Sequence, residues 1–144
     1  MENAIYNELL YRGYCVDVGV VETFEKKENG SVVRKNLEID FVCNLGESRI
    51  YIQSAFSLPD AEKRETEIRP FRKVGDSFKK ILITKDLCPT YHDENGILTM
   101  NVLDFLLNPD SLKIWVLAPK RNGAADSCVL RALVDDLSRL NCFL

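Results

Sequence analysis

The chain of 144 residues lacks the features that mark membrane and secreted proteins. No apolar run approaches the ~18 residues that a membrane-spanning helix needs. The N-terminus has neither the basic region nor the apolar stretch of a secretory signal peptide, so we expect a cytoplasmic protein with no membrane partner. Internal repeats and low-complexity tracts are also missing, and the length fits one domain.

Histidine and paired cysteines are scarce. The five cysteines are scattered with no Cys-x-x-Cys pair, and His92 is the single histidine. These features argue against a structural zinc site or a disulfide framework and favour reduced thiols. His92 lies in an acidic run, 91–96, where it is either a metal ligand with its neighbours or part of a surface turn.

The sequence has no excess of basic charge. Its net charge of −3 argues against broad electrostatic affinity for nucleic acid. No Gly-x-x-x-x-Gly-Lys-[Ser/Thr] loop occurs, so no ATP site is expected. Two basic clusters form either a phosphate-binding surface or a solvated face. They consist of Lys26, Lys27, Arg34 and Lys35, and of Arg69, Arg72, Lys73, Lys79 and Lys80.

Hydrophobic spacing and turn signals predict the order α-β-β-β-α-β-β-α, a mixed sheet with helices on it. Helices are expected over 2–12, over a segment that begins at residue 59, and over 102–107. The second of these has an apolar stripe of Ala61, Glu65, Ile68 and Phe71. Strands are expected over 14–25, 37–42, 49–55, 79–84 and 97–101. Turns at 29–30 and 45–47 predict that the first three strands form an antiparallel meander. Residues 111–144 form a C-terminal extension of uncertain structure, with a strand at 113–118 and an amphipathic helix at 125–141.

Asp40 is the most informative residue, because it places a carboxylate inside the apolar strand 37–42. Burying a charge costs several kcal/mol unless a partner compensates it. Gln53 interrupts the next apolar strand and can meet Asp40 as a cross-strand pair. Glu2 either shares the buried helix face of Ile5 and Leu9 or is a solvated acid in the first turn, where the helix dipole favours negative charge.

Spacing leaves two interpretations of these polar residues open. In the first, Glu2 and Asp40 bind Mg²⁺ or Mn²⁺, which prefer oxygen ligands, and the metal activates a water for attack on a phosphodiester. In the second, Asp40 accepts hydrogen bonds from a buried amide, and Gln53 is its partner.

Several blocks of sequence also carry a family resemblance. They are 2–14, 16–19, 38–42, 51–55, 67–71, 76–80, 96–97 and 104–107. In this order they resemble the domain of unknown function that follows the nucleotide-binding module in a large family of prokaryotic AAA-type ATPases. The resemblance covers residues 2–108 and implies a PD-(D/E)XK nuclease-like fold with an α-β-β-β-α-β core, that is, a restriction-endonuclease-like α/β domain.

The resemblance assigns catalytic positions to Glu2, Asp40 and Gln53. Glu2 matches the helix acid and Asp40 the strand acid, so these two would bind Mg²⁺, and Gln53 matches the acid-or-glutamine position. The family has lysine two residues later, where it would activate water, but Ala55 stands there. Three cations could replace it from another element: Lys63, Lys73 and Arg64.

We therefore expect residues 1–110 to be a nuclease-like domain, detached or truncated from its ATPase module. The preferred hypothesis is a catalytically degenerate module that binds DNA or another protein, or regulates an ATPase domain. The alternative is a Mg²⁺-dependent DNA phosphodiesterase. The sequence does not specify an oligomeric state.

Overall fold

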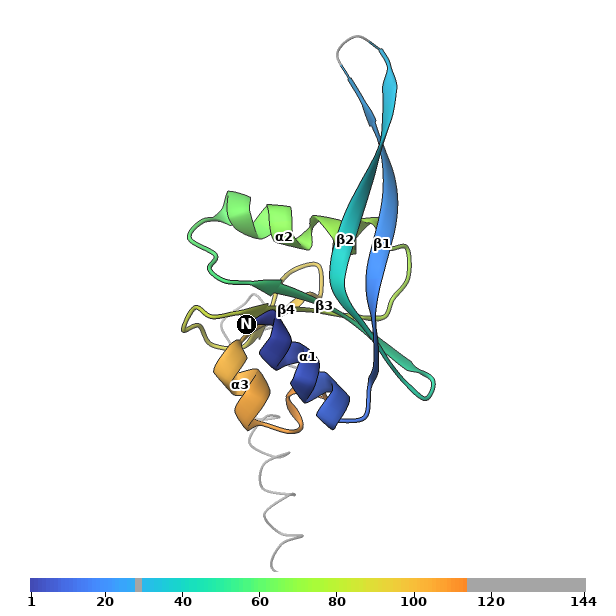
Figure 1. Ribbon diagram of the computed structural model, residues 1–144. Coiled ribbons are helices and arrows are strands. Elements are labelled where there is room, and N and C mark those ends of the chain that lie inside the picture. Colours follow the sequence, from blue (N-terminus) through green and yellow to red (C-terminus); the bar gives the residue numbers. More distant parts are fainter. Residues whose placement is uncertain (28–29, 114–144) are drawn as a thin grey trace, which may run out of the picture.

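A six-stranded mixed sheet organises the part of the chain that the computed structural model describes, residues 1–27 and 30–113. The helices are α1 (Glu2–Tyr11), α2 (Ala61–Lys73) and α3 (Val102–Leu107), followed by a 3₁₀ turn, Ser111–Lys113. The strands are β1 (Cys15–Lys26), β2 (Val32–Leu45), β3 (Ser48–Ala55), β4 (Lys79–Thr84), β5 (Tyr91–His92) and β6 (Leu98–Asn101). The predicted mixed α/β sheet flanked by helices is confirmed (Figure 1).

The strand order is β1-β2-β3-β4-β6-β5. The first three strands form the predicted antiparallel meander, whereas β3, β4 and β6 run parallel to one another. Residues 91–92 were expected in a turn but form the short edge strand β5, antiparallel to β6. Two residues are too few to show the alternation from which a strand is predicted. The predicted strand 113–118 and helix 125–141 lie outside the described residues, apart from Lys113.

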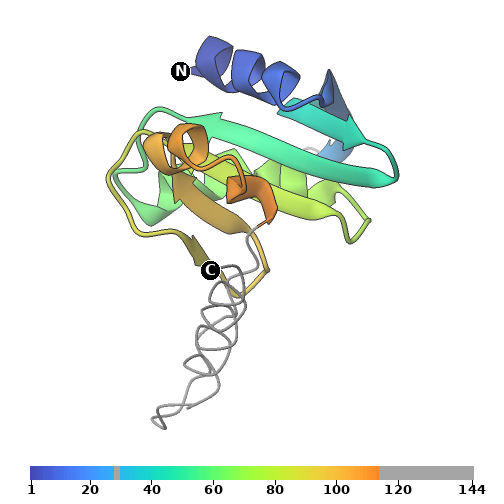
Figure 2. The ribbon, with the colours of Figure 1, turned by 90° about the horizontal axis from the view of Figure 1, so that it is seen from below.

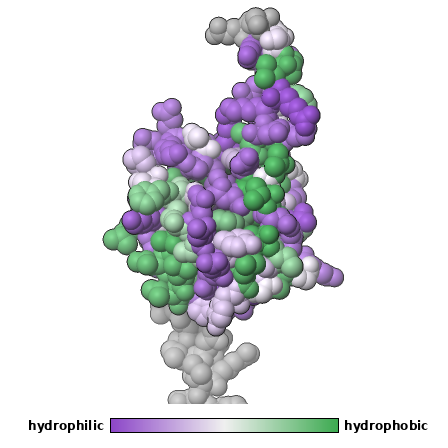
Figure 3. All heavy atoms as spheres, in the orientation of Figure 1, coloured by the Kyte–Doolittle hydropathy of each residue, from purple (hydrophilic) through white to green (hydrophobic). Residues whose placement is uncertain are grey.

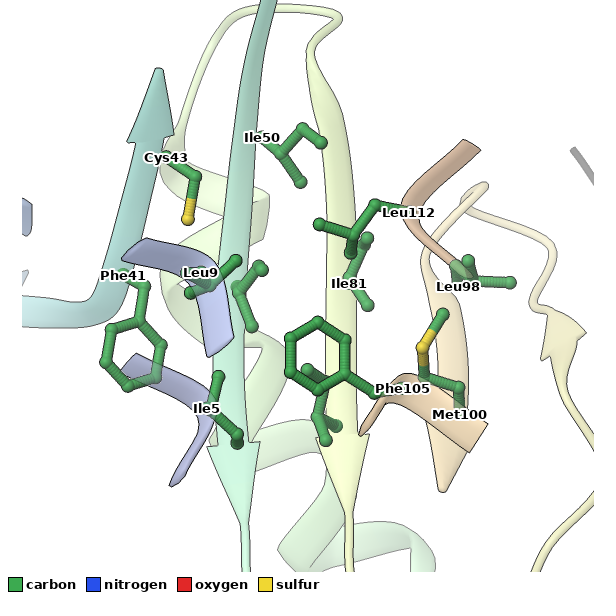
Figure 4. Packing of buried hydrophobic residues seen from close by; sticks show 12 residues of the cluster. Ile5, Leu9, Phe41, Cys43, Ile50, Ile81, Leu98, Met100, Phe105 and Leu112 are labelled. Carbon is green, nitrogen blue, oxygen red and sulfur yellow. The ribbon is translucent and has the colours of Figure 1, made fainter. Parts of the chain in front are cut away.

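Helices α1 and α3 cover one face of the sheet and α2 covers the other (Figure 2). Figure 4 shows Ile5 and Leu9 of α1 with Phe105 of α3 on the larger core, which they share with side chains of the strands. Cys43 belongs to this core, and burial raises the pKa of its thiol to about 12, so it packs as a neutral group. Leu112, from the predicted C-terminal extension, also packs there.

Helix α2 packs through its C-terminal half. Asp60 caps its N-terminus, since its carboxylate accepts a hydrogen bond from the Lys63 backbone at 2.7 Å. The predicted apolar stripe is only partly right, because Ala61 and Glu65 are exposed and burial is confined to Ile68, Pro70 and Phe71. Pro70 lies within the last turn and has no N–H to donate to the preceding turn, yet the helix continues to Lys73.

Arg12 ties the end of α1 to α3 and the 3₁₀ turn. Its guanidinium pairs with Glu8 at 2.8 Å and donates to the Phe105 carbonyl at 2.5 Å and the Ser111 hydroxyl at 2.9 Å. It also lies over the Phe105 ring, 4.5 Å from the centroid. The side chain is nearly buried, so these charge-assisted bonds offset the cost of removing the cation from water.

A β-bulge bends the β1–β2 hairpin where it passes the core. Asp17 pairs with Val42 and Gly19 with Ile39, so β2 uses one residue more than β1 over this interval. A Cβ atom at Gly19 would lie 2.8 Å from Val42 Cγ2 and 3.1 Å from Ile39 Cβ. Both neighbours are β-branched and stiff, so this close packing requires glycine.

We predict that Gly19→Ala lowers the free energy of unfolding by about 1–3 kcal/mol, because the added methyl group overpacks the bulge. Urea denaturation followed by circular dichroism measures the effect. Gly75→Ala is the matched control, because nothing lies within 4 Å of a Cβ atom there. Equal stability of the two variants would show that the bulge relaxes freely.

Candidate nuclease-like site

Asp40 lies where β2 and β3 separate. The ladder between these strands runs from Leu45–Ser48 to Phe41–Ile52 and then stops. Asp40 is the next residue of β2. Its carboxylate extends toward β3 where the two backbones no longer form ladder hydrogen bonds.

The Asp40 carboxylate accepts three hydrogen bonds from β3. Oδ2 accepts the Ser54 backbone N–H at 2.8 Å and the Ser54 hydroxyl at 2.7 Å. Oδ1 accepts Nε2 of Gln53 at 3.0 Å. Hydrogen bonds to a charged acceptor are worth more than neutral ones, so this group compensates the half-buried charge without a metal.

Gln53 is directed at Asp40 through both ends of its amide. Besides the Nε2 bond, Oε1 faces the Asp40 backbone N–H at 3.4 Å. The expected contact between Asp40 and Gln53 is thus present, and the oxygen that a metal would use points at the backbone. Ser54 contributes two of the bonds, yet nothing in its sequence position beyond its adjacency to Gln53 indicated this role.

Glu2 does not join this group. It is exposed in the first turn of α1, so the expectation that it shares the buried face of Ile5 and Leu9 is wrong and the solvated alternative holds. Within residues 1–27 and 30–113, its carboxylate has no hydrogen-bond or ion-pair partner. In the same residues no three His, Cys, Asp or Glu side chains form a group that could hold a metal ion.

The three cations considered as replacements for the family lysine are engaged elsewhere or exposed. Lys63 pairs with Glu67 at 2.5 Å, and Lys73 is exposed on α2. Arg64 binds Asp93 at 3.0 Å and Thr99 at 3.3 Å. Ala55, at the family lysine position, is buried against α2.

The acidic run around His92 has a structural role. Asp93 accepts the backbone N–H groups of Asn95 and Ile97 at 2.9 Å, and it also binds Arg64. These bonds close the turn between β5 and β6 and fasten it to α2. His92 lies in β5, and its buried Nδ1 has no hydrogen-bond partner among the described residues.

Five of the nine cations of the two predicted basic clusters lie next to an acid. Arg34 pairs with Glu22, Arg69 pairs with Glu25, and Arg72 pairs with Glu65. Lys35 lies 3.9 Å from Glu25, and Lys80 lies 3.6 Å from Asp76. A continuous phosphate-binding face over the hairpin and α2 is therefore disfavoured, because acids alternate with the cations.

A hollow of about 250 Å³ lies beside the carboxyl ends of β3 and β4, the usual ligand position in parallel sheets. The charged residues that line this hollow already have partners within the protein. Asp86 accepts the Leu58 backbone N–H at 2.6 Å, and this bond lowers the pKa of its carboxyl. Asp60 caps α2 and Arg64 binds Asp93, so each charged group of the lining already has a partner in the protein.

Comparison with known proteins adds one relative. The chain is 34% identical over 110 residues to an uncharacterized protein of Haemophilus influenzae. The match covers 74% of this chain and 22% of that protein, so the chain spans about a fifth of the relative's length. No family model matches the chain, and no solved structure matches it. No helix of the described residues is long and apolar enough to cross a membrane.

We predict that Asp40→Ala lowers the free energy of unfolding by about 2–3 kcal/mol, because Ser54 and Gln53 lose a charged acceptor. Urea denaturation with and without MgCl₂ measures this. Asp17→Ala, at an exposed acid of the neighbouring strand, should change stability little. Mg²⁺ should not change the urea denaturation curve of the wild type or of either variant. Stabilisation of the wild type by Mg²⁺ that disappears in Asp40→Ala would instead identify Asp40 as a metal ligand.

Proposed function

We propose that the chain is a catalytically degenerate, nuclease-like module that assembles with a second copy of itself through the edge of β1. The loss of catalysis is supported by the site geometry. Asp40 is occupied by three donors, Glu2 is exposed, and Ala55 replaces the lysine. The match to part of a longer relative supports the view that this segment is a module.

The single observation that carries assembly is the outer part of the β1–β2 hairpin, residues 18–26 and 32–38, here called the arm. Figure 1 shows the arm extending beyond the helices. Isolated two-stranded ribbons are marginal in water, and apolar surface that is left exposed often marks an interface. Five large apolar residues of the arm are exposed: Val18, Val20, Phe24, Val32 and Val33.

Apolar side chains follow the outer edge of the arm. Val18 and Phe24 are 66% and 69% exposed, and Figure 3 shows hydrophobic residues interspersed with hydrophilic ones along the arm. In the part of the chain that the structure describes, β1 has a neighbouring strand on one side only. Its 12 residues contain no proline, so the free backbone groups can accept another strand.

A second copy fits this edge by its charge pattern. A two-fold axis at Val20 places Val16 of one copy opposite Phe24 of the other, and Asp17 opposite Thr23. No like charges meet in this antiparallel register. Apolar cross-strand pairs of this kind stabilise a sheet, and closed two-fold pairing protects both edges at once.

The assembly hypothesis predicts a concentration-dependent dimer in sedimentation velocity. Val20→Lys should weaken the dimer at least about tenfold, because a charge on an edge strand opposes pairing. Val32→Lys adds the same charge on β2, away from the free edge, and should leave the dimer intact. A wild-type monomer at submillimolar concentration, or equal weakening in both variants, would contradict assembly through β1.

The loss of catalysis has a separate test. With Mn²⁺ or Mg²⁺, the wild type should cleave supercoiled and single-stranded DNA no faster than Asp40→Asn, which keeps the shape of the side chain. Gel electrophoresis of the products over time measures the rate. Metal-dependent cleavage that is lost in Asp40→Asn would restore the alternative hypothesis, a Mg²⁺-dependent phosphodiesterase.

A further inference from the structure

A groove of about 430 Å³ lies at the end of β3 opposite to Asp40. Its size falls in the range of about 300–1,000 Å³ that small-molecule sites occupy. Aromatic rings and cations meet in its lining, which includes Tyr14, Phe78, Arg49, Lys79 and Lys113 together with a single acid, Glu47.

Cations and a second ring surround Phe78, which lines the groove. The Arg49 guanidinium lies 5.7 Å from the centroid of the Phe78 ring, and the rings of Phe78 and Tyr51 meet edge to face at 6.5 Å. Lys80 Nζ lies 5.9 Å from the Tyr51 centroid. Tyr51 is fixed by its bond to Asp76 at 2.6 Å, whereas Phe78 is 42% exposed. Part of the Phe78 ring is therefore accessible to a ligand.

Arg49 differs from the paired arginines of the arm and α2. Arg49 donates to the neutral amide oxygen of Asn44 at 2.8 Å, not to a carboxylate, so its charge is not cancelled. Lys79 donates to the Leu112 carbonyl at 2.8 Å, and burial lowers the pKa of its amine. Lys113 pairs with Asp110 at 2.8 Å and stays largely exposed.

We propose that this groove binds a nucleoside phosphate, with the base on the Phe78 ring and the phosphate beside Arg49. Stacking on an aromatic ring needs an unstacked base, so the ligand is a free nucleotide or one unit of a single strand and not a duplex. The site is independent of the β1 edge, and no triphosphate-binding loop is required.

Fluorescence anisotropy with a fluorescein-labelled oligothymidylate, with unlabelled thymidine monophosphate as competitor, tests the proposal without divalent metal. Arg49→Glu should weaken binding at least about tenfold and lower the salt dependence by about one charge. Phe78→Leu should weaken it about 5- to 100-fold by removing the stacking surface. Arg72→Glu, an equal charge reversal on α2, is the matched control and should bind like the wild type.

Competition by the monophosphate at concentrations near its own affinity would identify a free nucleotide as the ligand, and its failure to compete would identify a single strand. Thermal unfolding of each variant shows whether the fold is kept. If Arg49→Glu does not fold, Phe78→Leu decides the result. No binding by the wild type, or equal loss in Arg72→Glu and Phe78→Leu, overturns the proposal.

Discussion

The contact of Asp40 with Ser54 and Gln53 determines how the sheet is divided. At this point β2 stops pairing with β3. If the ladder continued, the Ser54 N–H would donate to a backbone carbonyl of β2, but here it donates to the Asp40 carboxylate. Beyond it, β2 pairs with β1 alone, so the arm leaves the body as a two-stranded ribbon. The half-buried charge, the break in the ladder and the two-stranded arm therefore belong to one local arrangement.

The same arrangement separates two ends of β3 with different chemistry. At its carboxyl end, the polar groups around Asp40 satisfy one another and leave little capacity for a metal. At its amino end, Arg49 is held by a neutral amide beside an exposed ring. Arg34 and Arg72 pair with acids of the arm and of α2, whereas Arg49 keeps an uncancelled charge at this end of the sheet.

The sequence was sufficient to predict the helices and strands that have a strong hydrophobic periodicity. Strand 79–84 and helix 102–107 have the predicted bounds, and the meander follows from its two turns. Contacts set by tertiary packing were less predictable. Glu2 has the helical spacing of a buried residue, but α1 is not covered on that flank, and Ser54 gives no signal until β2 and β3 are seen to part. Periodicity reports the direction of a side chain, whereas burial depends on what packs against it.

Arg12 has a consequence for the order in which the chain can fold. Its bonds to Phe105 and Ser111 join residues 93 and 99 positions apart, so the first helix is fastened by the last described turn. Such distant contacts cost more loop-closure entropy than local ones and slow the search for the native state. During synthesis, α1 leaves the ribosome early but must wait for α3 before its C-terminal end is secured. Until then the apolar face of Ile5 and Leu9 is only partly covered, and the nascent chain is most open to misfolding in that interval.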